Sequence, residues 1–67
     1  MKITKISQLT GNTNTLELNV TLEQLQRFEN RVNTGEYLQT IFSQLTKEER
    51  EFILTGITPT EWNEIFN

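Results

Sequence analysis

Apolar and polar residues along the first twenty positions follow a pattern that predicts two strands. Residues 16–20 alternate strictly between apolar and polar, which is the period of a strand with one buried face. Residues 2–9 instead carry an apolar residue at every third position, ending at Leu9, and this spacing predicts a strand with an irregularity such as a bulge. Between them, the Gly and Asn residues of 11–14 favour a turn. The pattern therefore predicts a β-hairpin over residues 2–20.

Two apolar stripes with helical spacing follow the hairpin. The first predicts a helix over about residues 21–33 and the second a short helix over about residues 36–44. Thr21 and Gln24 have the spacing of a capping box, in which each side chain bonds a free backbone N–H at the start of a helix. The residues expected to face the core are Leu22, Leu25, Phe28 and Val32 in the first stripe and Tyr37, Leu38, Ile41, Phe42 and Leu45 in the second.

The last third of the chain is typical of two short helices on either side of Gly56. Capping boxes that open at Thr46 and Thr58 predict helices over about residues 47–55 and 59–66. Gly56 suits the left-handed conformation that ends a helix. Together the elements predict an α+β fold in a single small domain, with an N-terminal β-hairpin packed against three or four short helices.

Length and charge narrow the classes of function. A chain of 67 residues forms one domain, and a core of this size rarely contributes more than ~3–5 kcal/mol, so oligomerisation would help to stabilise it. Nine glutamates against six basic residues give a net charge of -3, opposite to the basic surface that nucleic-acid binding requires. The chain shows no apolar run long enough for a membrane span or a signal peptide, which predicts a soluble cytoplasmic protein.

The side chains on which most catalysis depends are missing from the chain. It has no histidine, the usual general base near neutral pH, and no cysteine nucleophile. Glu48, Glu49 and Glu51 are clustered, but on a helix they spread around the axis. They are also interleaved with Lys47 and Arg50, which favours a solvated face with its own ion pairs. We therefore expect a non-enzymatic protein without a cofactor or a metal site.

Four motifs together resemble one group of proteins. They are Lys2-Ile-Thr-Lys-Ile, Val20-Thr21-x-x-Gln24, Gly35-x-x-x-Gln39-x-x-Phe42 and Arg50-Glu-Phe-Ile-x-Thr-Gly-Ile-Thr-x-x-Glu-Trp62. Over nearly the whole chain they are similar to small uncharacterised proteins encoded by tailed phages. This resemblance implies a viral origin and a location in the host cytoplasm, and it allows a host-directed role. The group has no assigned activity, so the resemblance implies no catalytic residues. Ser43 stands where such proteins commonly carry proline.

The expected mode of action is binding to a host or viral protein. Trp62, Ile65 and Phe66 form one stripe of the last predicted helix. These residues either dock on the hairpin and complete the core, which the small size of the chain favours, or anchor the protein in a partner's groove. Tyr37 is amphipathic and suits a core edge or an interface. The candidate partner-binding residues are Tyr37, Gln39, Arg50, Trp62 and Phe66.

Two other functions and one assembly stay open. A regulator could contact nucleic acid through basic side chains, although Arg27 also has Glu23 at the i,i+4 spacing of a surface ion pair. A small-ligand sequestering protein would have its pocket at a subunit interface. The free edge of a two-stranded sheet, or the exposed part of the helix over Tyr37–Leu45, predicts a homodimer. The candidate nucleic-acid residues are Lys2, Lys5, Arg27 and Arg31.

Overall fold

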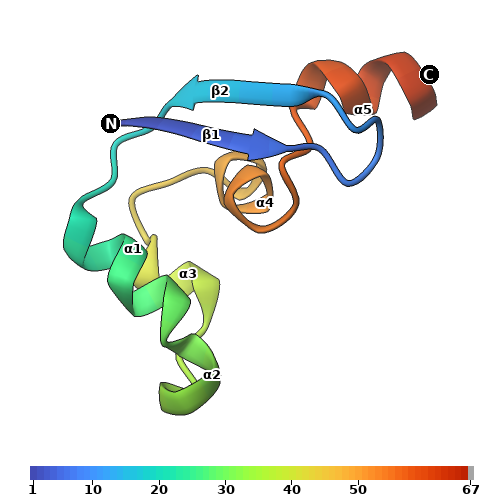
Figure 1. Ribbon diagram of the computed structural model, residues 1–67. Coiled ribbons are helices and arrows are strands. Elements are labelled where there is room, and N and C mark those ends of the chain that lie inside the picture. Colours follow the sequence, from blue (N-terminus) through green and yellow to red (C-terminus); the bar gives the residue numbers. More distant parts are fainter. Residues whose placement is uncertain (67) are drawn as a thin grey trace.

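The computed structural model describes residues 1–66 and has the expected α+β arrangement, a hairpin followed by short helices (Figure 1). Strands β1 (Lys2–Ile6) and β2 (Thr13–Glu17) form a two-stranded antiparallel sheet. Thr4 and Thr15 lie opposite each other in the register, and their hydroxyl oxygens are 2.8 Å apart. The predicted hairpin is thus confirmed, but its second strand lies at residues 13–17 instead of 16–20, and the residues expected in the turn include the start of β2.

The bulge expected in the first strand is not found, and that prediction was wrong. Along the whole of β1, each residue pairs with one residue of β2. The strand ends at Ile6, and Leu9 lies in the turn that follows, so the apolar spacing of three does not belong to one strand. Ser7 holds this turn through hydrogen bonds of its backbone and its hydroxyl. Its backbone N–H donates to the Asn12 carbonyl at 2.8 Å, and its hydroxyl accepts from the Leu9 N–H at 3.2 Å.

Five short helices follow among the described residues because the first expected helix is split at Asn30. The Asn30 backbone has φ -91° and ψ 2°, outside the helical range. Its side-chain amide donates to the Gln26 carbonyl at 3.0 Å, a local bond that competes with continued helix. The helices are α1 (Leu22–Glu29), α2 (Arg31–Thr34), α3 (Leu38–Ile41), α4 (Lys47–Thr55) and α5 (Pro59–Phe66).

The helix expected over residues 36–44 is reduced to the single turn of α3. It cannot begin earlier because Tyr37 has an extended backbone, with φ -83° and ψ 148°. It ends at Phe42, whose φ of -115° and ψ of 50° leave the helical region. The Leu45 N–H then donates to the Phe42 carbonyl at 3.0 Å, so a turn replaces the expected last part of the helix.

The three expected capping boxes are all present. The Thr21 hydroxyl accepts from the Gln24 N–H at 3.1 Å, and the Gln24 side chain accepts from the Thr21 N–H at 3.0 Å. The same exchange opens α4 at Thr46 and α5 at Thr58. Residues three apart in the sequence therefore determine where these helices begin.

The core lies between the hairpin and helices α1, α3 and α4 (Figure 1). Phe42 and Phe52 are fully buried at its centre. Leu18 and Val20 are buried beyond the end of β2, which confirms the single buried face predicted for residues 16–20. The buried cluster consists of Ile3, Leu18, Val20, Ile41, Phe42, Leu45, Phe52 and Ile53.

Three residues expected to face the core are exposed, in contrast to the prediction, and one of them is Tyr37, which is 74% exposed before the start of α3. Val32 is 85% exposed because it lies beyond the break at Asn30, so the stripe of α1 does not reach it. Leu22 is 63% exposed. At 100° per residue it lies about 120° around the helix from Phe28, at the edge of the stripe. Only Leu25 and Phe28 of this stripe pack against the core.

Helix α5 turns a glutamate, not its aromatic residues, toward the hairpin. Glu61 is only 6% exposed. Its carboxylate accepts from the Thr10 hydroxyl, from the Thr58 N–H at 3.0 Å and from the Asn14 side-chain amide at 2.8 Å. These hydrogen bonds, the one from Thr10 foremost, hold the pKa of Glu61 below its usual range, although burial acts in the opposite direction. The capping residue of α5 therefore also ties this helix to the hairpin turn.

Candidate functional site

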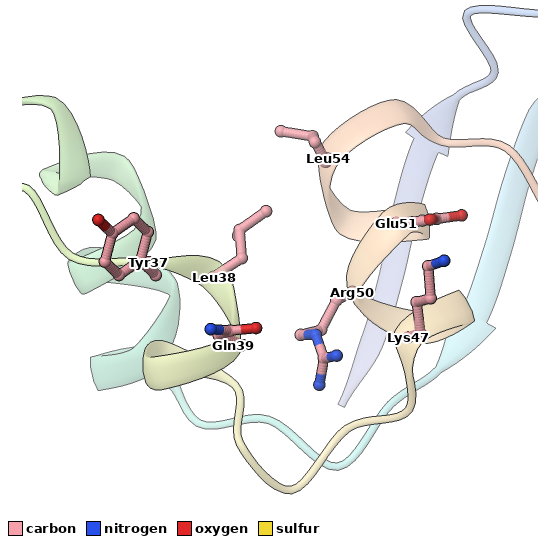
Figure 2. A pocket seen from close by; sticks show the side chains of 7 residues that line it. All are labelled: Tyr37, Leu38, Gln39, Lys47, Arg50, Glu51 and Leu54. Carbon is pink, nitrogen blue, oxygen red and sulfur yellow. The ribbon is translucent and has the colours of Figure 1, made fainter.

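Three of the predicted partner-binding residues surround one hollow between α3 and α4. Tyr37 and Gln39 come from the α3 side and Arg50 from α4, and Figure 2 shows their side chains around the gap between the two helices. The hollow has a volume of about 290 Å³. It is lined by Tyr37, Leu38, Gln39, Lys47, Arg50, Glu51 and Leu54.

Local backbone geometry builds both walls of this first hollow. Tyr37 precedes α3 with an extended backbone, so its carbonyl accepts from Ile41 at 3.0 Å while its side chain stays 74% exposed. Leu38, the next residue, packs partly against the core. On the opposite wall the Arg50 guanidinium donates to the Leu45 carbonyl at 2.9 Å. This bond holds a cationic group on the wall opposite the exposed Tyr37 ring (Figure 2).

A second hollow, of about 300 Å³, lies between α4 and α5. Lys47 and Glu51 line both hollows, so the two lie on either side of the same exposed surface of α4. We call the two hollows together the α4 face. The second hollow is lined by Lys47, Glu48, Glu51, Pro59, Trp62 and Asn63.

The aromatic residues of α5 border the α4 face instead of completing the core. Trp62, Ile65 and Phe66 are 38%, 48% and 63% exposed, so the favoured prediction that they dock on the hairpin was wrong. The physical reason is the buried carboxylate of Glu61, which occupies the side of α5 toward the hairpin. The rings of Trp62 and Phe66 contact each other, with centroids 4.7 Å apart. They form an exposed aromatic pair at the edge of the second hollow.

The charged side chains of the α4 face make no ion pairs among the described residues. Lys47 and Arg50 are cationic, Glu48 and Glu51 are anionic, and the ion pairs of residues 1–66 lie elsewhere. The self-paired surface expected for this helix is therefore not formed. These four charges are available to groups on another molecule.

Sequence patterns had not indicated Leu54 or Lys47 as part of a site. Leu54 is 44% exposed, although it follows the buried residues Phe52 and Ile53 directly. A run of three apolar residues on a short helix exceeds the arc that one buried face can cover, and this was the signal available for Leu54. Lys47 carried no such signal, because its place between two hollows depends on how α3 and α5 approach α4.

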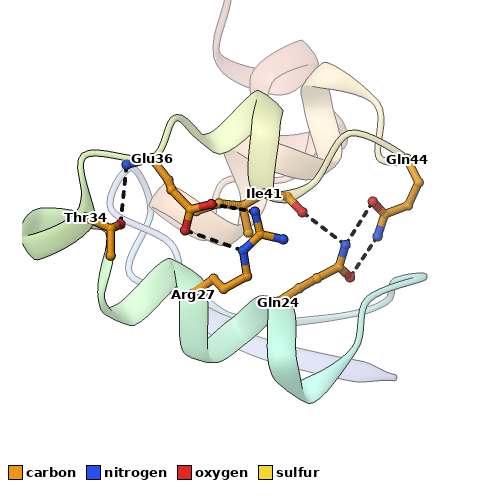
Figure 3. A network of polar contacts seen from close by, with 6 residues as sticks. All are labelled: Gln24, Arg27, Thr34, Glu36, Ile41 and Gln44. Carbon is orange, nitrogen blue, oxygen red and sulfur yellow. Dashed lines mark hydrogen bonds and ion pairs between the residues drawn. The ribbon is translucent and has the colours of Figure 1, made fainter.

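A polar network holds α1 to the segment around α3 (Figure 3). Gln24 donates to the Ile41 carbonyl at 3.0 Å and exchanges hydrogen bonds with Gln44 at 3.0 and 2.9 Å. Arg27 pairs with Glu36 instead of Glu23, at 2.5 Å between Nη2 and Oε1. The hydrogen bond from Arg27 lowers the pKa of Glu36, and Glu36 raises the pKa of Arg27. The Arg27 side chain therefore makes its ion pair within the protein and helps to hold α1 to the segment before α3.

Two other candidate nucleic-acid residues, Lys5 and Arg31, lie over one aromatic ring. The Arg31 guanidinium lies 4.0 Å from the centroid of the Phe28 ring and donates to the Phe28 carbonyl at 2.7 Å. The Lys5 ammonium lies 5.6 Å from the same centroid. Lys2 and Lys5 line a third hollow of about 400 Å³ between the hairpin and α1. With Arg27 in an ion pair, the four residues do not present one free basic surface.

Comparison with protein families, curated proteins and solved structures finds no match to this chain. None of the described helices has the length and apolar character needed to cross a membrane. Within residues 1–66, no three His, Cys, Asp or Glu side chains are grouped so that they could hold a metal ion.

Proposed function

We propose that this protein is a small phage-type accessory protein that acts by binding another protein through the α4 face. The observation that carries the proposal is the position of three exposed rings: Tyr37 and Trp62 each line one hollow, and Phe66 contacts Trp62. A chain of 67 residues gains stability from every large side chain it buries. Leaving three rings near one surface outside the core is therefore costly unless another molecule covers them.

The chemistry of the α4 face suits a protein interface. Aromatic residues and arginine contribute most strongly to such interfaces, particularly beside hollows from which water is displaced on binding. Tyr37 and Arg50 border the first hollow, and Trp62 borders the second. The cationic and anionic side chains of the α4 face would fix the orientation in which a partner binds.

Two further considerations support the proposal. The chain contains no histidine and no cysteine, which weighs against acid–base or nucleophilic catalysis. The phage-type origin rests on the sequence resemblance and the motifs that carry it, and this origin allows a host or a viral protein as the partner.

An affinity capture from a bacterial host lysate tests this function. Wild-type protein is compared with Tyr37→Ala and Trp62→Ala, which truncate one ring at each hollow. Val32→Ala serves as the matched control, because Val32 is 85% exposed and lies on α2, outside the lining of both hollows. We expect wild type and the control to recover the same protein, and each face variant to recover at least about tenfold less. Equal recovery by all the variants would contradict the proposal.

A further inference from the structure

The α4 face has a charge pattern that is complementary to itself. Lys47 and Glu51 line both hollows and stand at the middle of the face. Arg50 lines only the first hollow, and Glu48 lines only the second. The face is therefore more positive on its α3 side and more negative on its α5 side. A two-fold axis that lies in the contact plane and runs along α4 would place the positive side of one copy against the negative side of another.

We propose that a second copy of this chain covers the α4 face in a two-fold symmetric dimer. This inference rests on the proposed function, since it takes the same face as the binding surface and names the molecule that occupies it in the absence of another partner. In this arrangement Arg50 meets Glu48 of the second copy, while Lys47 and Glu51 lie near the axis, each closest to its own counterpart. The contact of Arg50 with Glu48 occurs twice, as a two-fold interface requires.

The apolar groups of the face follow the same symmetry. The first hollow has apolar walls at Leu38 and Leu54, and its rim carries the exposed Tyr37 ring. The second hollow is bordered by Trp62, whose ring contacts Phe66. The two-fold axis brings the Trp62–Phe66 pair of each copy to the first hollow of the other. The dimer thus covers the three exposed rings of both chains at once.

A dimer through the α4 face differs from one formed at the edge of the hairpin. The hairpin has free strand edges, but β1 carries Lys2 and Lys5, and lysines on an edge strand oppose pairing with another sheet. The α4 face combines exposed rings, two hollows and four charges without ion pairs among the described residues. Its self-complementary charge order is the feature that selects a second copy.

Charge exchange between two variants tests this dimer. Sedimentation equilibrium of the wild type should give twice the 7.9 kDa of one chain. Arg50→Glu places two acids opposite each other, and Glu48→Lys places two bases opposite each other. Each should therefore raise the dimer dissociation constant by at least about tenfold. In an equimolar mixture the new acid of one variant faces the new base of the other, so the heterodimer should form again.

Two controls protect the test from a loss of folding. Arg50 also bonds the Leu45 carbonyl, so circular dichroism must show that Arg50→Glu is folded. Lys47→Glu and Glu51→Lys make the same change of charge near the axis, where each residue faces its own counterpart and no side-chain hydrogen bond within the described residues is lost. Each of these two variants should therefore stay dimeric. If folded Arg50→Glu and Glu48→Lys fail to associate on mixing, the proposal is overturned.

Two further results would also overturn the dimer. One is a wild-type mass that stays at 7.9 kDa across a hundredfold range of concentration. The other is Arg50→Glu and Glu48→Lys variants that each dimerise as well as the wild type, which would place the contact on another surface. The proposed function is judged separately: a monomeric wild type whose capture of a host protein depends on Trp62 overturns only the dimer. A charge-dependent dimer whose capture of a host protein ignores Tyr37→Ala and Trp62→Ala overturns only the host-binding function.

Discussion

At the scale of single residues, Gly56 meets two requirements at once. It ends α4 in the left-handed conformation, with φ 77°. It also lies against β1, because a Cβ built on it would stand 2.5 Å from the Ile6 carbonyl oxygen. Its own carbonyl accepts from the Asn14 side-chain amide at 2.9 Å. Gly56 is thus both a helix end and a point of close contact with the hairpin.

Substitution of two glycines separates these requirements. Gly35 is also left-handed, with φ 74°, but nothing lies within 4 Å of a Cβ built there. We expect Gly35→Ala to lower the free energy of unfolding by about 1 kcal/mol, the cost of the conformation alone. Gly56→Ala should lower it by at least about 2 kcal/mol, because the backbone of β1 must also move. Urea unfolding measures both, and equal losses would exclude the close contact as a cause.

At the scale of elements, helix α5 has a polar face on one side and an aromatic face on the other. Glu61 faces the hairpin turn through its hydrogen bonds to Thr10 and Asn14. Trp62 and Phe66 point away from the core and stay exposed. The two sides make different predictions, one about pH and one about packing.

The hydrogen bonds of Glu61 predict a loss of stability in acid. A carboxyl whose pKa is lower in the folded than in the unfolded state contributes stability above the unfolded pKa, and this is lost as pH falls through the folded value. The pKa of Glu61 is lowered, mainly by the Thr10 hydroxyl. Wild type should therefore be more stable than Glu61→Gln near neutral pH, and the difference should shrink on acidification.

Urea unfolding of both proteins between about pH 7 and about pH 3 measures that difference. Comparing the two proteins at each pH removes the separate contribution of Glu36, whose pKa is also lowered. Glu64→Gln, on the exposed part of α5, controls for the change in net charge. A difference that stays constant with pH would contradict the role assigned to the Glu61 carboxylate.

The aromatic side of α5 predicts a mild effect of truncation on folding. Trp62 is 38% exposed, whereas Phe52 is fully buried. We expect Trp62→Ala to remain folded and to lose at most about 2 kcal/mol, and Phe52→Ala to lose about 3–5 kcal/mol. Thermal unfolding followed by circular dichroism measures both. If Trp62→Ala were unfolded, the result would contradict the exposed position of Trp62 and indicate that its ring is part of the core.

At the scale of the whole molecule, the small core is accompanied by a large exposed apolar surface. Eight residues form the buried cluster, while Tyr37, Trp62 and Phe66 remain outside it. Any molecule that covers the exposed rings in the native state alone stabilises the fold by mass action. The stability of this protein should therefore depend on its own concentration if a second copy covers the α4 face.

A concentration series of thermal unfolding measures this coupling. We expect the wild-type Tm to rise over a hundredfold increase in protein concentration, because the folded state associates and the unfolded state does not. Arg50→Glu should show a Tm that does not change with concentration. A wild-type Tm independent of concentration would mean that association with a second copy contributes nothing to the stability of the folded chain.

The sequence by itself determined the local features of this protein. The capping boxes at Thr21, Thr46 and Thr58 and the left-handed Gly56 all appear where they were predicted. These features depend on residues at most a few positions apart, so their geometry can be recognised without knowing the fold. The alternation of residues 16–20 likewise predicted that Leu18 and Val20 are buried, although the strand itself ends at Glu17. The α+β class follows from these local signals.

Only the tertiary structure decided which faces of the helices are covered. The capping box placed Glu61 correctly but could not show that its carboxylate also reaches Thr10 and Asn14. That long-range contact turns Trp62 outward, and the break at Asn30 exposes Val32 in the same way. Periodicity identifies an apolar stripe, but the partner that covers it depends on how distant elements pack. The gathering of Tyr37, Gln39 and Arg50 around one hollow has the same origin.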